Sequence, residues 1–135
     1  MTTGRCACER VRYEIDGPIK HITHCHCSIC RRAHGAAFAT YGALSRKRFR
    51  ITAGEDQLRT FVSSEKAVRN FCGTCGTPLF WSHAEHPDVI DVSIGTVDGD
   101  PGGRAKAHIF VGSKAPWVEI TDGLPQYEAE YPQGG

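Results

Sequence analysis

The segment Cys72-Gly73-Thr74-Cys75-Gly76 decides the fold, because two cysteines separated by two residues form the usual grip of a zinc-binding turn. Gly73 and Gly76 permit the tight turn that lets both sulfurs converge on one point. A second pair, Cys6-Ala-Cys8, lies near the amino terminus, and residues two apart in an extended segment point to the same side. We predict that the two pairs supply four thiolates to one tetrahedral zinc, which has no vacancy and is therefore structural.

The remaining three cysteines form the cluster Cys25-His-Cys27-Ser-Ile-Cys30. Three protein ligands and one free position are typical of a catalytic zinc, where water or substrate fills the fourth place. A histidine as fourth ligand would instead close the site, since Cys₃His is a standard structural set. His24, His26 and His34 are near enough in sequence to be that ligand. The spacing alone favours neither the open site nor the closed one.

Two other uses of these cysteines stay open on spacing alone. Cys27 and Cys30 have the spacing of a redox Cys-x-x-Cys motif, but no strand–helix unit surrounds them. Cys25 and Cys30 could also join the Cys72–Cys75 pair, which would leave the Cys6–Cys8 pair unused. The grouping into four and three uses every thiol, and we prefer it for that reason.

Length and charge restrict the class of protein. The chain has 135 residues, the size of one domain, and 16 basic against 15 acidic side chains give a formal charge of +1. It therefore lacks the broad basic field on which nucleic-acid binders and anionic-membrane binders rely. Residues 1–17 lack the apolar stretch of a signal peptide, so we expect a soluble, cytoplasmic protein. We expect one domain over residues 1–135, with residues 131–135 as a frayed tail.

Apolar and polar residues alternate in several short runs, which predicts a mainly β fold with little helix. The first run is Val11, Tyr13 and Ile15. The others are Phe49 and Ile51; Ile90, Val92 and Ile94; and Ala107, Ile109 and Val111. The best helical candidates are short pieces at 27–32 and 64–68, and the turn formers at 97–104 predict an exposed loop.

Four blocks of the chain resemble, in order, the glutathione-dependent formaldehyde-activating enzyme family, which includes the centromere-protein-V proteins. The blocks are Gly4-Arg-Cys6-Ala-Cys8 with Val11-Arg-Tyr13; Cys25-His-Cys27-Ser-Ile-Cys30-Arg31 with Gly35; Arg69-Asn-Phe71-Cys72-Gly-Thr-Cys75-Gly76; and His108-Ile-Phe-Val-Gly-Ser113-Lys114-Ala-Pro116-Trp117 with Asp122-Gly-Leu-Pro125. The resemblance implies small β-sheets meeting like a tent, stapled by a structural zinc. Its ligands would be Cys6, Cys8, Cys72 and Cys75. It also implies a more labile zinc on Cys25, Cys27 and Cys30, which favours the open site.

The activity that the resemblance implies is a carbon–sulfur lyase run in reverse, joining glutathione and formaldehyde into S-(hydroxymethyl)glutathione. Many members of the family have no established substrate, so the resemblance defines the site better than the reaction. We expect Arg31, Ser113, Lys114 and Trp117 to contact the thiol substrate. The plain alternatives are that the two cations are solvated and that Trp117 belongs to the core.

A zinc-stapled binding module without catalysis is the competing function, with a protein or nucleic acid as partner. The local basic enrichment that would support nucleic-acid contact lies at Arg31-Arg32 and Arg46-Lys-Arg48. The near-zero net charge argues against nucleic-acid contact. His21, His83 and His86 are expected to be surface or packing residues.

Overall fold

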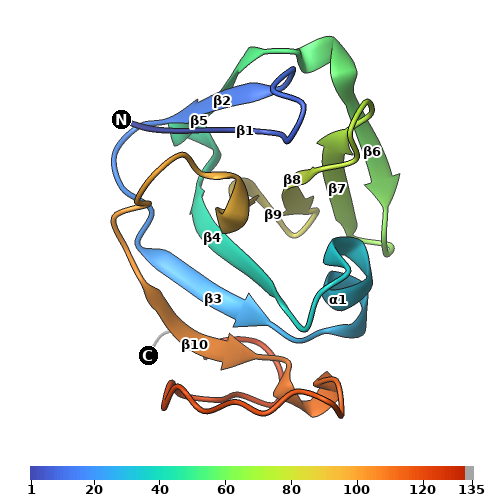
Figure 1. The fold of residues 1–135 in the computed structure, drawn as a ribbon, viewed down its shortest axis with the longest axis vertical. Helices are drawn as coiled ribbons and strands as arrows, with labels where there is room; N and C mark the ends of the chain where they lie inside the picture. Colours follow the sequence, from blue (N-terminus) through green and yellow to red (C-terminus); the bar gives the residue numbers. More distant parts are fainter. Residues whose placement is uncertain (133–135) are drawn as a thin grey trace.

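The computed structural model describes residues 1–132 and shows a mainly β architecture, which confirms the predicted fold class (Figure 1). A small sheet has the strand order β1-β2-β5, and a large sheet has the order β10-β3-β4-β9-β8-β7-β6. The strands of the small sheet are β1 (Thr2–Arg5), β2 (Arg12–Ile15) and β5 (Phe49–Ala53). Those of the large sheet are β3 (His21–Cys25), β4 (Ala39–Ser45), β6 (Leu58–Val62), β7 (Ala67–Cys72), β8 (Pro78–His83), β9 (His86–Ser93) and β10 (Ala105–Ile109).

Antiparallel hairpins dominate both sheets, and helix is a minor component. The exception is the parallel pairing of β10 with β3, which brings Ile109 beside Cys25. The helix α1 spans Ser28–His34 and ends at Gly35, whose positive φ of 59° suits glycine. Short 3₁₀ turns complete the described elements: η1 (Arg46–Arg48), η2 (Glu55–Gln57), η3 (Ile94–Thr96) and η4 (Val111–Ser113).

The predicted helical piece at 64–68 is wrong, because these residues form the turn and first part of a hairpin. Val62 pairs with Val68 across β6 and β7, and the Ser64 hydroxyl accepts a hydrogen bond from the Ala67 amide. Two predicted strands also end early. Ile94 begins the turn η3, and β10 stops at Ile109 because the chain turns at Phe110, whose φ is 55°.

One core joins the two sheets. Tyr13 and Ile15 of the small sheet are buried together with Leu79, Ile90 and Val92 of the large sheet. The Tyr13 ring stacks on Phe49 at 5.2 Å between centroids, and its hydroxyl lies 2.7 Å from the Thr96 hydroxyl.

Gly4 is required beside this ring, because a Cβ at this position would lie 2.2 Å from the Tyr13 ring and hydroxyl. Glycine is therefore the residue that lets β1 approach β2 so closely.

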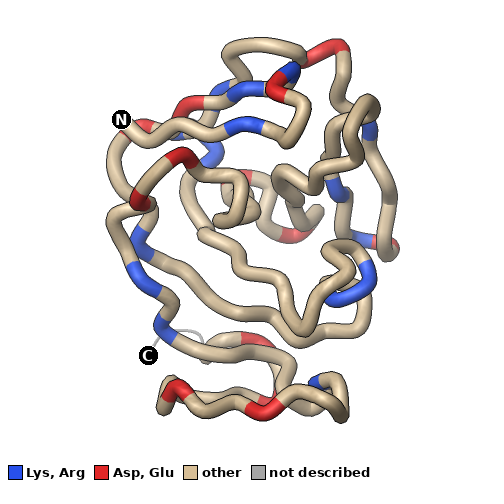
Figure 2. Tube along the Cα trace, in the orientation of Figure 1, with Lys and Arg blue, Asp and Glu red and all other residues tan. Residues whose placement is uncertain are grey.

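Basic and acidic residues are interspersed along the described chain (Figure 2). The basic triplet at 46–48 is engaged locally: Arg46 donates a hydrogen bond to the Pro87 carbonyl at 2.9 Å, and Arg48 donates one to the Asp16 carbonyl at 2.6 Å. These cations hold neighbouring loops in place. Within residues 1–132, no helix has the length and apolar character needed to cross a membrane.

The end of the described chain lies against the large sheet. The Tyr131 ring meets the His21 ring at 5.2 Å between centroids, and the Lys106 ammonium lies 5.4 Å from its centre. The rest of the tail predicted to be frayed, residues 133–135, lies outside the described residues.

Candidate metal centres and their cavity

Four cysteines from the two sheets bring their sulfurs together at one point. Cys6 and Cys8 lie in the turn between β1 and β2, whereas Cys72 ends β7 and Cys75 lies in the turn before β8. The four sulfur atoms lie within 4.8 Å of one another. Cys6 and Cys8 are separated by 3.6 Å between sulfurs, and Cys8 and Cys72 by 3.7 Å. These separations are far longer than a disulfide bond, so the four thiols are free.

Backbone amides point at the buried sulfurs of this cluster. The Val11 amide donates to the Cys6 sulfur at 3.3 Å, and the Thr74 amide donates to the Cys72 sulfur at 3.4 Å. Burial raises the pKa of Cys6 to about 11, despite the amide of Val11, so its thiolate requires a compensating positive charge. Gly76 has a φ of 81°, which permits the tight turn between Cys75 and β8.

The other three cysteines converge at the end of β3. Cys25 ends that strand, Cys27 is the residue before α1, and Cys30 lies in the first turn of the helix. Their sulfurs also lie within 4.8 Å of one another, and both Cys25 and Cys30 are buried. The pKa of Cys30 is lowered by hydrogen bonds from Cys25 and from Arg69, whose Nη2 lies 3.4 Å from the sulfur. This cluster therefore favours thiolate at Cys30.

No histidine joins these three sulfurs among residues 1–132. His26 lies between two of the cysteines but points away, with Nε2 at 2.8 Å from Nδ1 of the buried His108. His108 in turn lies 2.8 Å from the Asp122 carboxylate through Nε2. His24 lies 2.7 Å from the Thr40 hydroxyl, and His34 lies 3.2 Å from the Tyr41 hydroxyl. Each candidate for the fourth ligand therefore has another partner.

A cavity of about 370 Å³ covers the three sulfurs. Arg69 on β7 and Tyr41 on β4 form its wall beside Cys30, and the Arg69 Nη1 donates to the Tyr41 hydroxyl at 2.8 Å. Burial raises the pKa of Tyr41, so the hydroxyl keeps its proton at neutral pH. The Arg69 guanidinium also lies 5.8 Å from the Trp81 ring, which is cation–π range. The cavity therefore presents hydrogen-bond donors next to the cysteines.

Other polar residues of this cavity have no role in the sequence-based prediction. Asp91 on β9 lines it, and burial, with the nearby Cys30 charge, raises the pKa of its carboxyl to about 7. His21, His83 and His86 line it as well; His86 is exposed and His21 packs against Tyr131, in keeping with the expected surface or packing roles. Arg69 is the first residue of the third sequence block. Its side chain faces the cavity because of the pairing of β7 with β8, and no local sequence pattern predicts this.

The residues predicted to contact substrate lie elsewhere, and none of them lines the cavity over the three sulfurs. Arg31 donates through Nε to the His26 carbonyl at 3.4 Å. The Lys114 ammonium donates to the carbonyls of Ala115 and Val118, which closes the turn after η4. Ser113 is exposed, and Trp117 is 71% exposed.

The family model for the glutathione-dependent formaldehyde-activating enzymes matches residues 1–113 of the chain. The chain belongs to this family. The matched residues contain both cysteine clusters, Arg69 and Asp91.

Curated fungal relatives carry the name glutathione-dependent formaldehyde-activating enzyme as a provisional description. One from Pyrenophora teres f. teres is 33% identical over 75 residues, which cover 56% of this chain and 40% of the relative. One from Colletotrichum graminicola is 31% identical over 80 residues, which cover 58% of this chain and 42% of the relative. The match therefore spans about two fifths of the length of each of these relatives.

A crystal structure of a Rhodobacter sphaeroides protein has a similar fold. The TM-score is 0.62, and the alignment covers 93% of this chain and 98% of that one at 21% identity. At this identity the likeness concerns the fold alone.

Proposed function

We propose that the protein is a zinc-dependent carbon–sulfur lyase that acts on a thiol adduct, with glutathione and formaldehyde as the reactants that family membership suggests. The observation that carries the proposal is the cluster of three cysteines, which has no fourth protein ligand among residues 1–132 and lies in a cavity with room for substrate. The seven free thiols fit a reducing compartment such as the cytoplasm.

The donor sets of the two clusters fit zinc. A tetrahedral zinc with metal–sulfur bonds of about 2.3 Å requires sulfur–sulfur separations of about 3.8 Å. The observed 3.6 Å between Cys6 and Cys8 and 3.7 Å between Cys8 and Cys72 lie close to that value. We therefore assign a structural zinc to the four-cysteine cluster. Its proposed ligands are Cys6, Cys8, Cys72 and Cys75.

The second, labile zinc is assigned to Cys25, Cys27 and Cys30. When bound there, zinc supplies a Lewis acid that stabilises the thiolate form of the substrate. At pH 7 a free thiol with a pKa of about 8.5 is only a few per cent thiolate, so this stabilisation is worth roughly thirtyfold at most. The protein's own side chains must supply the remaining acceleration.

Arg69 and Tyr41 are placed to bind the carbonyl oxygen of the second reactant. They are hydrogen-bonded to each other beside Cys30, and both keep donors at neutral pH. Donors fixed in advance at the oxygen where negative charge develops lower the barrier of carbonyl addition.

Asp91 is placed to move the proton. As the sulfur–carbon bond forms, the carbonyl π pair becomes a lone pair on oxygen, and that oxygen takes up one proton. A carboxyl with a pKa near 7 is partly protonated at neutral pH, so it can donate that proton and accept it again in the reverse reaction. The proton lost by the substrate thiol restores the acid, so the addition is balanced.

The direct test is exchange NMR of ¹³C-formaldehyde with glutathione, with and without stoichiometric zinc-loaded protein. We expect exchange above the uncatalysed rate. Removal of the labile metal by a chelator should abolish it, and free zinc at equal concentration should not replace the protein. A rate equal to the background with fully loaded protein would remove this activity.

A further inference from the structure

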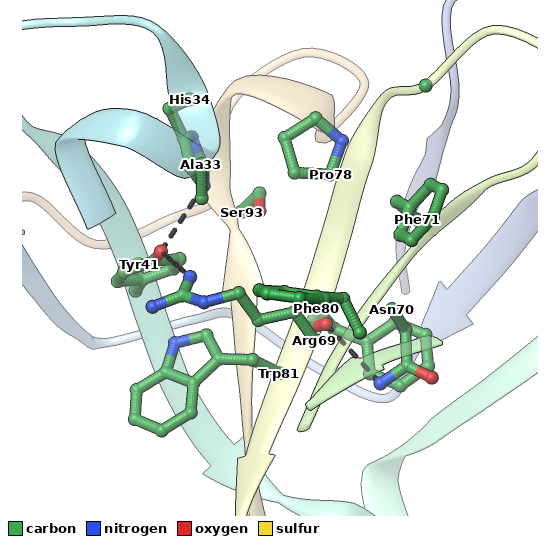
Figure 3. Close-up of a pocket in the computed structure, with 12 residues that line it drawn as sticks. Ala33, His34, Tyr41, Arg69, Asn70, Phe71, Pro78, Phe80, Trp81 and Ser93 are labelled. Carbon is green, nitrogen blue, oxygen red and sulfur yellow. Dashed lines mark hydrogen bonds between the residues drawn. The ribbon is translucent and has the colours of Figure 1, made fainter. Parts of the chain in front are cut away.

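A second cavity of about 340 Å³ is lined by Arg69 together with mainly apolar side chains (Figure 3). Strands β7 and β8 supply Phe71, Pro78 and Phe80, and Figure 3 shows these rings together with Trp81 around the same space. The Phe61 ring of the edge strand β6 also lines it, and this ring is 58% exposed. The cavity is predominantly apolar, and its size falls in the range of small-molecule sites.

The charge in the lining of this cavity is positive. Arg69 is the charged side chain of its lining, and no carboxylate faces it among the described residues. Burial, with the nearby Arg69 cation, lowers the pKa of His34, so this imidazole is neutral at pH 7. Arg69 Nε and Trp81 Nε1 are buried donors without a hydrogen-bond partner among residues 1–132, and both side chains line this cavity. The lining therefore suits an apolar body that carries an oxygen acceptor and no positive charge.

The two cavities are neighbours. Tyr41, Arg69 and Trp81 line both of them. On α1, Cys30 lines the cavity over the sulfurs, and Ala33 lines the apolar one. Residues three apart on a helix have their Cβ atoms roughly 5–6 Å apart, so the two cavities lie within the length of one short carbon chain.

Formaldehyde leaves this second cavity unused. Its single carbon and oxygen make it little larger than water, whose share of liquid volume is about 30 Å³. The apolar cavity alone is roughly ten times that size. A ring-sized or short-chain apolar substituent fills such a space. Its transfer from water into an apolar cavity is favourable.

We propose that the carbonyl reactant of this site carries an apolar substituent, so that the adduct is a hemithioacetal of a larger aldehyde whose apolar part occupies the cavity lined by Phe61, Phe71 and Phe80. This inference rests on the proposed thiol-adduct chemistry. The reaction is the same addition: a carbon–sulfur bond forms, the carbonyl π bond breaks, and the thiol proton ends on the adduct oxygen.

The test compares two stable thioether analogues of the adduct, S-hexylglutathione and S-methylglutathione, by calorimetric titration of the zinc-loaded protein. We expect the hexyl compound to bind at least tenfold tighter. Ala33→Phe should reduce the ratio to within threefold, because Ala33 is exposed on α1 and a ring there would fill the cavity without disturbing the core. The matched control Ala33→Ser should keep the ratio of the wild type.

Equal binding of the two compounds, or of neither, overturns the inference, and so does a large ratio that Ala33→Phe leaves unchanged. The formaldehyde exchange assay is read separately. If exchange exceeds the background and the two compounds bind equally, the proposed apolar subsite is excluded and the formaldehyde activity stands. Background exchange together with a large ratio that Ala33→Phe abolishes supports the apolar subsite and removes formaldehyde as reactant.

Discussion

Replacing Asp91 with asparagine tests the electrostatics of the cavity. Burial, with the Cys30 charge, raises the pKa of this carboxyl from 3.8 to about 7, so the folded protein holds its proton over a pH range in which the unfolded chain has lost it. Below pH 4 both states are protonated. The stability that the neutral carboxyl contributes is then lost as the pH rises, and the loss is complete above pH 7. At about 1.4 kcal/mol per pKa unit, the full effect is about 4 kcal/mol as an upper bound.

Asp91→Asn keeps the shape of the side chain and removes the titration. We expect the variant to match the wild type at pH 4 and to be more stable by about 2–4 kcal/mol at pH 8, because asparagine avoids burying a charge. Urea unfolding of both zinc-saturated proteins from pH 4 to 8 measures the difference, in which the shared titration of the cysteines cancels. A stability difference that does not change with pH would refute the reasoning. The same variant should lose exchange activity by a factor of about 10².

Three further changes test other parts of the structure. Cys72→Ala should prevent stable folding, whereas Cys27→Ala should lower the zinc content and keep the fold. Zinc content is measured by metal analysis and folding by circular dichroism, and equal behaviour of the two variants would contradict the division into a structural and a labile site. Arg69→Lys keeps the charge but loses the joint contact with Tyr41 and Cys30, so exchange should fall at least about tenfold with unchanged zinc content; full activity would remove Arg69 from the mechanism. Gly4→Ala should cost about 1–3 kcal/mol in urea unfolding, because its Cβ would displace Tyr13; a neutral result would contradict the close approach of β1.

The two cysteine clusters were predictable because metal ligation uses short, recognisable spacings. Within Cys25–Cys30 and Cys72–Cys75, the cysteines are close in sequence, and local turns bring their sulfurs together. Strands β2, β5, β9 and β10 were predictable for the same local reason, since alternation reports one buried face, whereas the other strands were not predicted. The helix predicted at 64–68 was wrong because the turn between β6 and β7 carries no Asn-Gly or similar hairpin signal.

The cavity was not predictable from local patterns, because its walls come from strands that are distant in sequence. Asp91 and Arg69 face the three cysteines only because the sheet has the order β4-β9-β8-β7. The contact of His26 with His108 likewise depends on the parallel register of β10 with β3. Non-local pairings of this kind are set by tertiary packing.

The four-cysteine cluster also determines how the chain is closed on itself. Cys8 and Cys72, whose sulfurs meet, are separated by 64 positions, so a metal held between them acts as a cross-link around that length of chain. As long as the metal stays bound, a cross-link of this span lowers the conformational entropy of the unfolded chain, which raises the free energy of that state by about 4 kcal/mol at 25 °C, as a disulfide would. Unlike a disulfide, this closure can form inside a reducing cell and can be reversed by metal withdrawal. Metal supply would then govern how long the small sheet stays attached to the large one, and with it the lifetime of the folded protein.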